Sequence, residues 1–216
     1  MKKLNLKNKL NFRSLVMVGI FSLALVAVSC NKADDGYFPE EAFSAQEAEL
    51  KKGKAVKPAS ETIAEIVVAS TEAEPAEFTL LLAALEYAGL TGVFAGGEQY
   101  TVFAPTDEAF VNLVTFLGVQ DAPNPFVAID AALGENTVKN VLLYHVTEGR
   151  RAANSVVPPV KDRTITTLLE GATFAVSKDG VIFDTFGQEA TILKANISAS
   201  NGIIHVINTV ILPLES

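Results

Sequence analysis

Two histidines are the side chains of this 216-residue chain best suited to acid–base or metal chemistry. His145 and His205 could bind a metal ion or transfer a proton if further ligands or carboxylates faced them at fixed geometry. Both instead lie within apolar runs that are typical of strands, Leu142–Val146 and Ile203–Ile207. We therefore expect each imidazole to be buried or half-buried and hydrogen-bonded to the backbone, rather than to act as a ligand or a base.

The common motifs of enzyme chemistry do not occur in the sequence. It has no Gly-x-Ser-x-Gly turn and no His-Glu-x-x-His helix, and a single cysteine excludes thiolate zinc sites. Gly96-Gly97 lacks the flanking residues of a phosphate-binding loop, and there is no calcium loop. The paired carboxylates Asp34-Asp35 and Glu40-Glu41 fall in a polar segment where we expect them to be solvated. We expect a protein that is not an enzyme, with no catalytic residue, cofactor or metal.

Arg150 and Arg151 form a basic pair on an acidic chain. Guanidinium groups can bind carboxylates through two parallel hydrogen bonds, so this pair could contact an acidic polysaccharide or another carboxylate. The alternative is an exposed pair that is simply solvated.

The N-terminus has the pattern of a bacterial export signal. Five basic residues and no acidic ones precede the apolar run Leu15–Val28, which is shorter than the roughly 20 residues that span a bilayer. Val26–Cys30 looks like a lipobox and contains the only cysteine of the chain. We expect residues 1–29 to be a lipoprotein signal peptide and Cys30 to carry acyl chains that anchor the protein to a lipid bilayer. The alternative is an ordinary secretory signal with an incidental cysteine.

Residues 30–59 read as a tether rich in Glu, Lys and Ala. Asn31–Asp35 resembles the Lys-plus-acid tags that send some lipoproteins of the Bacteroidetes type to the outer cell surface, and the alternative is the start of a solvated linker. We therefore expect an outer membrane lipoprotein that is exposed at the cell surface. A domain that faces the periplasm is the alternative.

The charge of the processed chain would be strongly negative. Residues 1–29 hold five of the 17 basic residues and none of the 25 acidic ones, which leaves 12 basic and 25 acidic residues and a net charge of −13. Such a charge favours solubility and argues against nucleic acid as a partner.

The elements that must position these residues fall within residues 60–216, which are enough for one domain with a sizeable core. Apolar spacing and capping signals predict helices over residues 63–70, 78–88, 106–116, 126–133 and 137–143. Alternating and β-branched runs predict strands over residues 100–104, 164–168, 173–176, 181–183, 190–197 and 203–212. Because most helices precede most strands, the fold class is α+β. The last strand is apolar on both faces, so we expect it to be central in its sheet.

Several segments, taken in their order along the chain, resemble the fasciclin domain, an extracellular adhesion and interaction module. Thr101–Phe110 (TVFAPTDEAF) resembles its first signature block, Gly202–Pro213 its second, and Tyr144-His145 its central tyrosine–histidine pair. Thr62–Leu90 resembles its helical lead-in. The resemblance covers Ser60–Leu214 and implies a fasciclin-like fold, with N-terminal helices packed on a wedge-shaped β-sandwich.

The resemblance also has consequences for single residues. In animal fasciclin domains the region of Tyr144 and His145 is implicated in receptor contact, which makes this pair a possible partner contact here. The alternative is that alternation buries one of the two and leaves the other partly exposed. Asn196 and Asn208 stand where the family often has Asp, so they keep hydrogen-bonding capacity and lose a charge.

These observations predict a cell-surface-anchored lipoprotein that mediates adhesion or extracellular matrix and polymer interaction without catalysis. Its partner would be an extracellular protein or polysaccharide. The alternative is an accessory protein for glycan or small-ligand capture at the outer membrane or in the periplasm. That function would need an exposed aromatic platform, for which Tyr87, Tyr100 and Phe186 are the candidates in a chain without tryptophan. Two clustered exposed aromatic rings would favour this alternative, and a histidine exposed beside a carboxylate would favour an enzyme.

Overall fold

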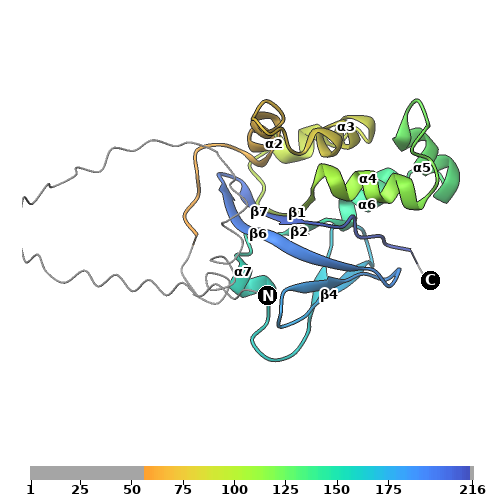
Figure 1. The fold of residues 1–216 in the computed structure, drawn as a ribbon. Coiled ribbons are helices and arrows are strands. Elements are labelled where there is room, and N and C mark those ends of the chain that lie inside the picture. Colours follow the sequence, from red (N-terminus) through yellow and green to blue (C-terminus); the bar gives the residue numbers. More distant parts are fainter. Residues whose placement is uncertain (1–55, 215–216) are drawn as a thin grey trace, which may run out of the picture. The chain divides into compact units, whose positions relative to one another are not determined.

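The computed structural model describes residues 56–214, which belong to the second of two compact units of the chain, Gly36–Ser216. The predicted signal peptide, the Cys30 anchor and the tether up to residue 55 lie outside the described residues. Within them, helices cover one side of a seven-stranded sheet, which confirms the α+β class (Figure 1).

The strands follow the order β2-β1-β7-β6-β5-β4-β3 across the sheet. All neighbours are antiparallel except β1 and β7, which run parallel and pair from Tyr100 with Gly202 to Pro105 with Ile207. Their bounds are β1 Tyr100–Pro105, β2 Val146–Glu148, β3 Arg163–Thr166, β4 Thr173–Val176, β5 Val181–Phe183, β6 Glu189–Ala199 and β7 Gly202–Ile207.

The last strand is central, as its two apolar faces predict. β7 lies between β1 and β6, and every residue of β7 and β1 is buried. The expected extent to Leu212 was wrong, because β7 ends at Ile207. After β7, side chains accept hydrogen bonds from the backbone amides. The Ile211 amide donates to His145 Nε2 at 3.1 Å, and the Leu212 amide donates to Asp184 Oδ2 at 2.8 Å. Val210, Ile211 and Leu212 stay buried without joining a ladder.

The sheet bends along β6, so that its two halves face each other as in a sandwich. Register shifts in β6 between Ile192 and Ile197 mark β-bulges, which increase local twist and bend a strand. Phe103 of β1 consequently packs edge-on against Phe174 of β4, with ring centroids 5.0 Å apart, although three strands separate them in the sheet order. One hydrophobic cluster fills the space between the halves, and a second fills the space between the helices and β1–β7.

The helices agree closely with the expected positions. Their bounds are α2 Ile63–Thr71, α3 Thr79–Tyr87, α4 Asp107–Phe116, α5 Pro125–Leu133, α6 Thr137–Tyr144 and the short α7 Ala153–Val156, with a 3-10 turn η2 at Thr91–Ala95. Thr62 and Glu65 form a capping box at the start of α2, and Thr106 caps α4 through its hydroxyl, which accepts from the Ala109 amide. These local bonds satisfy backbone donors that a helix leaves open at its first turn.

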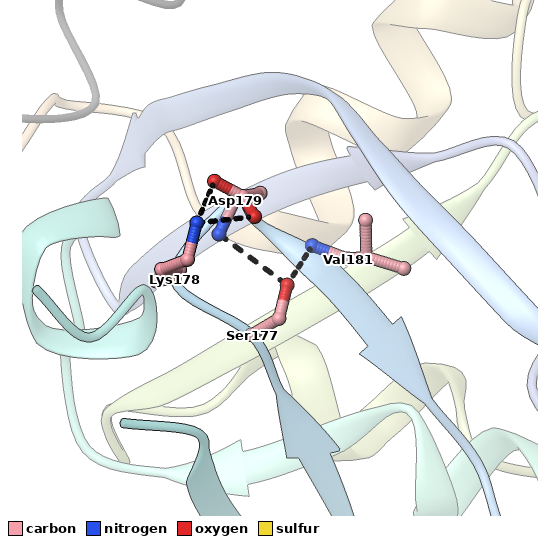
Figure 2. Close-up of polar contacts among 4 residues, drawn as sticks. All are labelled: Ser177, Lys178, Asp179 and Val181. Carbon is pink, nitrogen blue, oxygen red and sulfur yellow. Dashed lines mark hydrogen bonds and ion pairs between the residues drawn. The ribbon is translucent and has the colours of Figure 1, made fainter. Parts of the chain in front are cut away.

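A tight turn joins β4 to β5, and Figure 2 shows its polar contacts. The Ser177 hydroxyl accepts from the amides of Asp179 and Val181, at 3.3 and 3.2 Å. Gly180 takes φ +79°, a conformation that favours glycine. The Lys178–Asp179 ion pair at 2.9 Å is more than half exposed on both sides, so we assign it little stabilisation.

Candidate functional site

Tyr144 and His145, the pair expected to contact a partner, are both buried, with 0% and 2% of their surface exposed. α6 continues through Tyr144 and His145 caps its end, so the two residues do not alternate as they would on a strand. The expectation that one of them stays partly exposed was therefore wrong, and their burial contradicts a direct partner contact. Tyr144 instead donates to the Thr173 carbonyl at 2.8 Å and packs edge-on against Phe174.

His145 ties the end of α6 to the segment after β7. Its Nδ1 lies 2.7 Å from the Val141 carbonyl, which it reaches as a donor, and its Nε2 accepts from the Ile211 amide at 3.1 Å. Both ring nitrogens are thus used within the core, as expected for a buried imidazole bonded to backbone. Burial lowers the pKa of His145 to about 4, while the bond to Val141 acts in the opposite direction.

His205 makes the corresponding connection in the middle of β7. The ring is fully buried beside Phe103, with Nδ1 accepting from the Asn196 amide at 3.3 Å and Nε2 donating to the Arg151 carbonyl at 2.9 Å. Burial lowers its pKa to about 4 as well. Among residues 56–214 there is no group of three potential metal ligands, and no buried side-chain N or O atom lacks a hydrogen bond. Neither histidine faces a carboxylate that would make it a catalytic base.

Arg150 is a structural clamp rather than a free basic group. Its half-buried guanidinium binds the turn between β6 and β7 through the carbonyls of Ala199, at 2.6 Å, and Gly202. It also reaches the Ser198 hydroxyl at 2.6 Å, and that hydroxyl donates to the Lys57 carbonyl. The guanidinium also donates to the carbonyls of Val56 and Lys57, which are the first residues that the structure describes. Since these bonds occupy the guanidinium fork, it cannot also bind a carboxylate of a ligand side-on, and it is not simply solvated.

Arg151 lies apart from this clamp. Its amide donates to the Thr101 hydroxyl at 2.8 Å, and its Nε donates to the carbonyl of Glu148, the last residue of β2, at 3.2 Å. The two arginines therefore do not form one basic spot, because the chain directs them to different partners.

The two asparagines that replace frequent aspartates serve backbone groups. Asn196 lies in the β6 bulge at φ +65°, and its Oδ1 accepts from the Ala153 amide at 2.8 Å. Asn208 Oδ1 accepts from the Thr191 amide at 2.8 Å. A neutral amide oxygen is sufficient for both bonds, so the lost charge does not change how these segments are held.

A cleft of 190 Å³ lies between α4 and the segments that flank β6 and follow β7. Phe116, at the end of α4, is 67% exposed at this cleft. The ring of Phe186 stands beside it, with centroids 6.3 Å apart and planes inclined by 77°. The remaining lining residues are small, apolar or amide- and hydroxyl-bearing: Ala109, Asn112, Leu113, Gln188, Asn208, Thr209 and Val210.

The Phe116 cleft combines an exposed ring with uncharged polar groups. The Asn112 side chain makes no hydrogen bond to any described residue, and Gln188 and Asn208 add further amide groups. Such a surface can donate and accept hydrogen bonds beside an aromatic face, which suits a neutral polar ligand. Sequence reasoning missed Phe116 because it follows buried Leu113 by three residues, a helical spacing that places it in the core.

The aromatic residues predicted to form a platform do not come together. Tyr100 is buried, with its hydroxyl bonded to Glu98, and Tyr87 lies against Phe126 with its hydroxyl bonded to Asp130 at 2.9 Å. Phe186, which is half-buried, is the one of the three whose ring stands beside Phe116.

Comparison with known proteins agrees with the architecture. A model of the family described as "Fasciclin domain" matches residues 76–213. Protein sll1483 of Synechocystis is 31% identical over 77% of this chain and 84% of its own length, and the uncharacterized protein sll1735 of the same organism is 33% identical over 62% of this chain and 89% of its own. The transforming growth factor-beta-induced protein ig-h3 of Sus scrofa is 33% identical over 63% of this chain, which spans 18% of that longer protein.

Among solved structures, the chain is similar to a FAS1 domain pair from the insect cell adhesion molecule fasciclin I. The TM-score is 0.37 at 14% identity, over 80% of this chain and 46% of that one. The family model covers more than half of the present chain, and the matched range contains the strand β1, the helix α4 and the strand β7 described above. The chain belongs to the fasciclin domain family.

Proposed function

We propose that this protein is a cell-surface-anchored, non-catalytic fasciclin lipoprotein that binds an extracellular protein or polysaccharide. The observation that carries the proposal is the fasciclin domain over residues 76–213, since this family is associated with cell adhesion and matrix interaction and its domains are generally non-catalytic. The histidines support the same conclusion, because both are buried and committed to backbone.

The anchor in this proposal is Cys30, acylated after removal of residues 1–29. The tether would then hold the domain on the order of 30 Å from the lipid as a flexible coil. Many tethered copies could engage one polymer together, so that weak single contacts add up to firm attachment. In the described residues no helix is long and apolar enough to cross a membrane.

A second function, glycan or small-ligand capture, is favoured by the Phe116 cleft. Phe116 is exposed and the half-buried ring of Phe186 stands beside it, which meets in part the arrangement expected to raise this alternative. Asn112, whose amide bonds no described residue, lines the same cleft. The same cleft could serve adhesion if the sugar belongs to an insoluble polymer. The two functions differ in whether the ligand is fixed or soluble.

Protease shaving of intact cells tests the location. We expect added protease to remove the domain from cells that carry the wild-type chain, and Cys30→Ala to release the domain from the membrane fraction. Full protection in intact cells would contradict the surface location and favour the periplasmic alternative. Membrane retention of Cys30→Ala would contradict the lipid anchor.

Binding to immobilised polysaccharides and matrix proteins tests the contact surface. We expect Phe116→Ala to weaken binding by about tenfold or more, as for an aromatic residue central to an interface. Val111→Ala is the matched control, because Val111 is 51% exposed on the same helix and does not line the cleft. Equal loss in both variants would contradict the assignment to the Phe116 cleft. Competition by soluble oligosaccharides without cell attachment would favour capture over adhesion.

A further inference from the structure

A second cavity of the described residues lies between the N-terminal helices and the sheet, and neither proposed function uses it. It has a volume of 420 Å³, within the range of about 300–1,000 Å³ that is usual for small-molecule sites. Helices α2 and α3, the turn η2, strand β1 and the end of α6 enclose it. Figure 1 shows α2 and α3 together on one side of the sheet, and contacts join α2 to α3, η2 and β7.

The interior of this cavity is lined by apolar side chains. Ile63, Val67, Leu81 and Phe103 line it and are themselves 3% exposed or less. Protein interiors are normally packed with few voids larger than a water molecule, so a space of this size among well-buried residues is unusual. Apolar cavities also stay dry and accept apolar guests, because water inside them would find no hydrogen-bond partner.

The polar groups on the lining either are committed or lie at the mouth. His145 reaches the cavity, but its two nitrogens are bonded to Val141 and Ile211, so it offers no free donor. Glu86 and Thr91 line the cavity from exposed positions, as does Val68 at 43% exposure. These exposed residues mark the opening, between α2, α3 and η2.

The charge at the opening selects among lipophilic molecules. Among the residues from 56 to 214, Glu86 is the only charged one on the lining, and it would repel a carboxylate or phosphate that emerged beside it. The apolar interior would disfavour a buried charge of either sign. A neutral ligand, with at most a hydroxyl near Thr91, is neither repelled by Glu86 nor required to bury a charge.

We propose that this cavity binds a small, neutral, lipophilic molecule, which enters between α2, α3 and η2. The site lies on lining residues other than those of the Phe116 cleft, so it does not depend on the adhesion or glycan proposal. A fasciclin domain with such a site would carry an apolar compound as well as a surface contact.

Titration of the purified full chain with N-phenyl-1-naphthylamine, a neutral fluorescent probe of apolar sites, tests the proposal. We expect saturable binding at one site and a weakening of about tenfold or more in Ala64→Phe, which places a ring in the cavity. Ala69→Phe is the matched control on the exposed side of α2 and should change the affinity by less than about twofold. If Ala64→Phe does not fold, as judged by circular dichroism, Leu82→Phe fills the same cavity from α3.

The sulfonated analogue, 8-anilinonaphthalene-1-sulfonate, tests the preference for neutral ligands. We expect it to bind the wild-type chain at least about tenfold more weakly than the neutral probe, and Glu86→Gln to reduce this difference. Equal affinities would contradict the argument from charge and indicate a general apolar surface.

Two results would overturn the proposal. One is the absence of saturable probe binding to the full chain, the result expected if residues 36–55 or a second copy of the chain filled the cavity. The other is unchanged binding in both filling variants. Solvent extraction of the purified protein provides an independent measurement, and a neutral lipophilic compound recovered from wild type but not from Ala64→Phe would support the site.

Discussion

Each buried imidazole of this domain can work in only one protonation state. His145 accepts a hydrogen bond from the Ile211 amide, and His205 accepts one from the Asn196 amide. A second proton would turn each acceptor nitrogen into a donor that faces another donor, inside the buried core. The two residues that looked most capable of chemistry are therefore held neutral by the structure they connect.

The titration of the histidines should reveal this arrangement. The pKa of each falls from an ordinary value of 6.5 to about 4, so between these pH values the unfolded chain binds more protons than the folded one. The stability that the neutral rings contribute is fully present above about pH 6.5 and is lost as the pH falls towards 4. In NMR spectra we expect both rings to stay neutral at pH 5.5 in the folded protein. A midpoint near 6.5 for either ring would contradict their burial.

Gly202 is required by a close approach rather than by its backbone angles. A Cβ atom placed there would lie 2.1 Å from the Tyr100 carbonyl oxygen and 2.7 Å from Ile63 Cδ1. Gly202→Ala must separate β7 from β1 at their first pair, and we expect a loss of about 3 kcal/mol in the free energy of unfolding, at the upper end for overpacking. Gly97→Ala meets no atom within 4 Å and should change it little. Urea unfolding measures both, and equal effects would refute the steric explanation.

At the scale of elements, helices α3 and α4 hold each other's first turns. Phe78, which precedes α3, provides no side-chain cap. Asp107, the first residue of α4, accepts from the Thr79 amide at 3.1 Å and the Leu80 amide at 2.8 Å. In return Glu77 accepts from the Asp107 amide at 2.8 Å. A carboxylate in the first signature block thus acts across 28 positions of the sequence.

Loss of the Asp107 carboxylate should destabilise the domain more than loss of the neighbouring Glu108 carboxylate. We expect Asp107→Ala to cost about 2 kcal/mol, because it opens charge-assisted bonds to the amides of α3. Glu108→Ala removes an exposed carboxylate from the same first turn of α4 and should cost about 0.5 kcal/mol or less, through the helix dipole alone. Thermal unfolding of the two variants compares them directly. Similar losses of stability in the two variants would show that negative charge at the start of α4, rather than the link to α3, stabilises the domain.

The comparison of these helices explains what the sequence could predict. The cap of α4 by Thr106 was predictable, because the hydroxyl and the amide that it accepts from lie three residues apart. The cap of α3 was not, since its carboxylate belongs to another element. The same reason accounts for the end of β7, where distant His145 and Asp184 take the amides that a ladder would otherwise use.

At the scale of the whole molecule, polar side chains in and beside the turns join distant parts of the chain. Asn201 accepts from the Ile63 amide at 2.8 Å and donates to the Phe94 carbonyl at 2.7 Å, so it links α2, η2 and the β6–β7 turn. Arg150 links the same turn to the start of the described chain. Side-chain type and spacing identified the family but not these roles, because the partners become neighbours only after folding. The exposure of Phe116 could not be inferred either, because its helical spacing from Leu113 is that of a core residue.

The Arg150 clamp provides a prediction about the assembled domain. Arg150→Lys keeps the charge but loses the planar fork that reaches several acceptors together, so we expect a loss of about 2 kcal/mol in the free energy of unfolding. Arg151→Lys loses one side-chain bond at a more exposed position and should be close to neutral. Urea unfolding checks both values. A tolerated Arg150→Lys would mean that point charge alone holds the β6–β7 turn.

The position of this clamp also determines how the domain would bear force. If the protein is tethered at its N-terminus and holds a partner, tension enters the domain at Val56 and Lys57, where Arg150 and Ser198 bind the chain. From there the load passes to the β6–β7 turn, and so to the two central strands rather than to α2 directly. The bonds of the clamp would therefore carry the load while the anchor is under tension. The helices around the apolar cavity would then not be pulled apart.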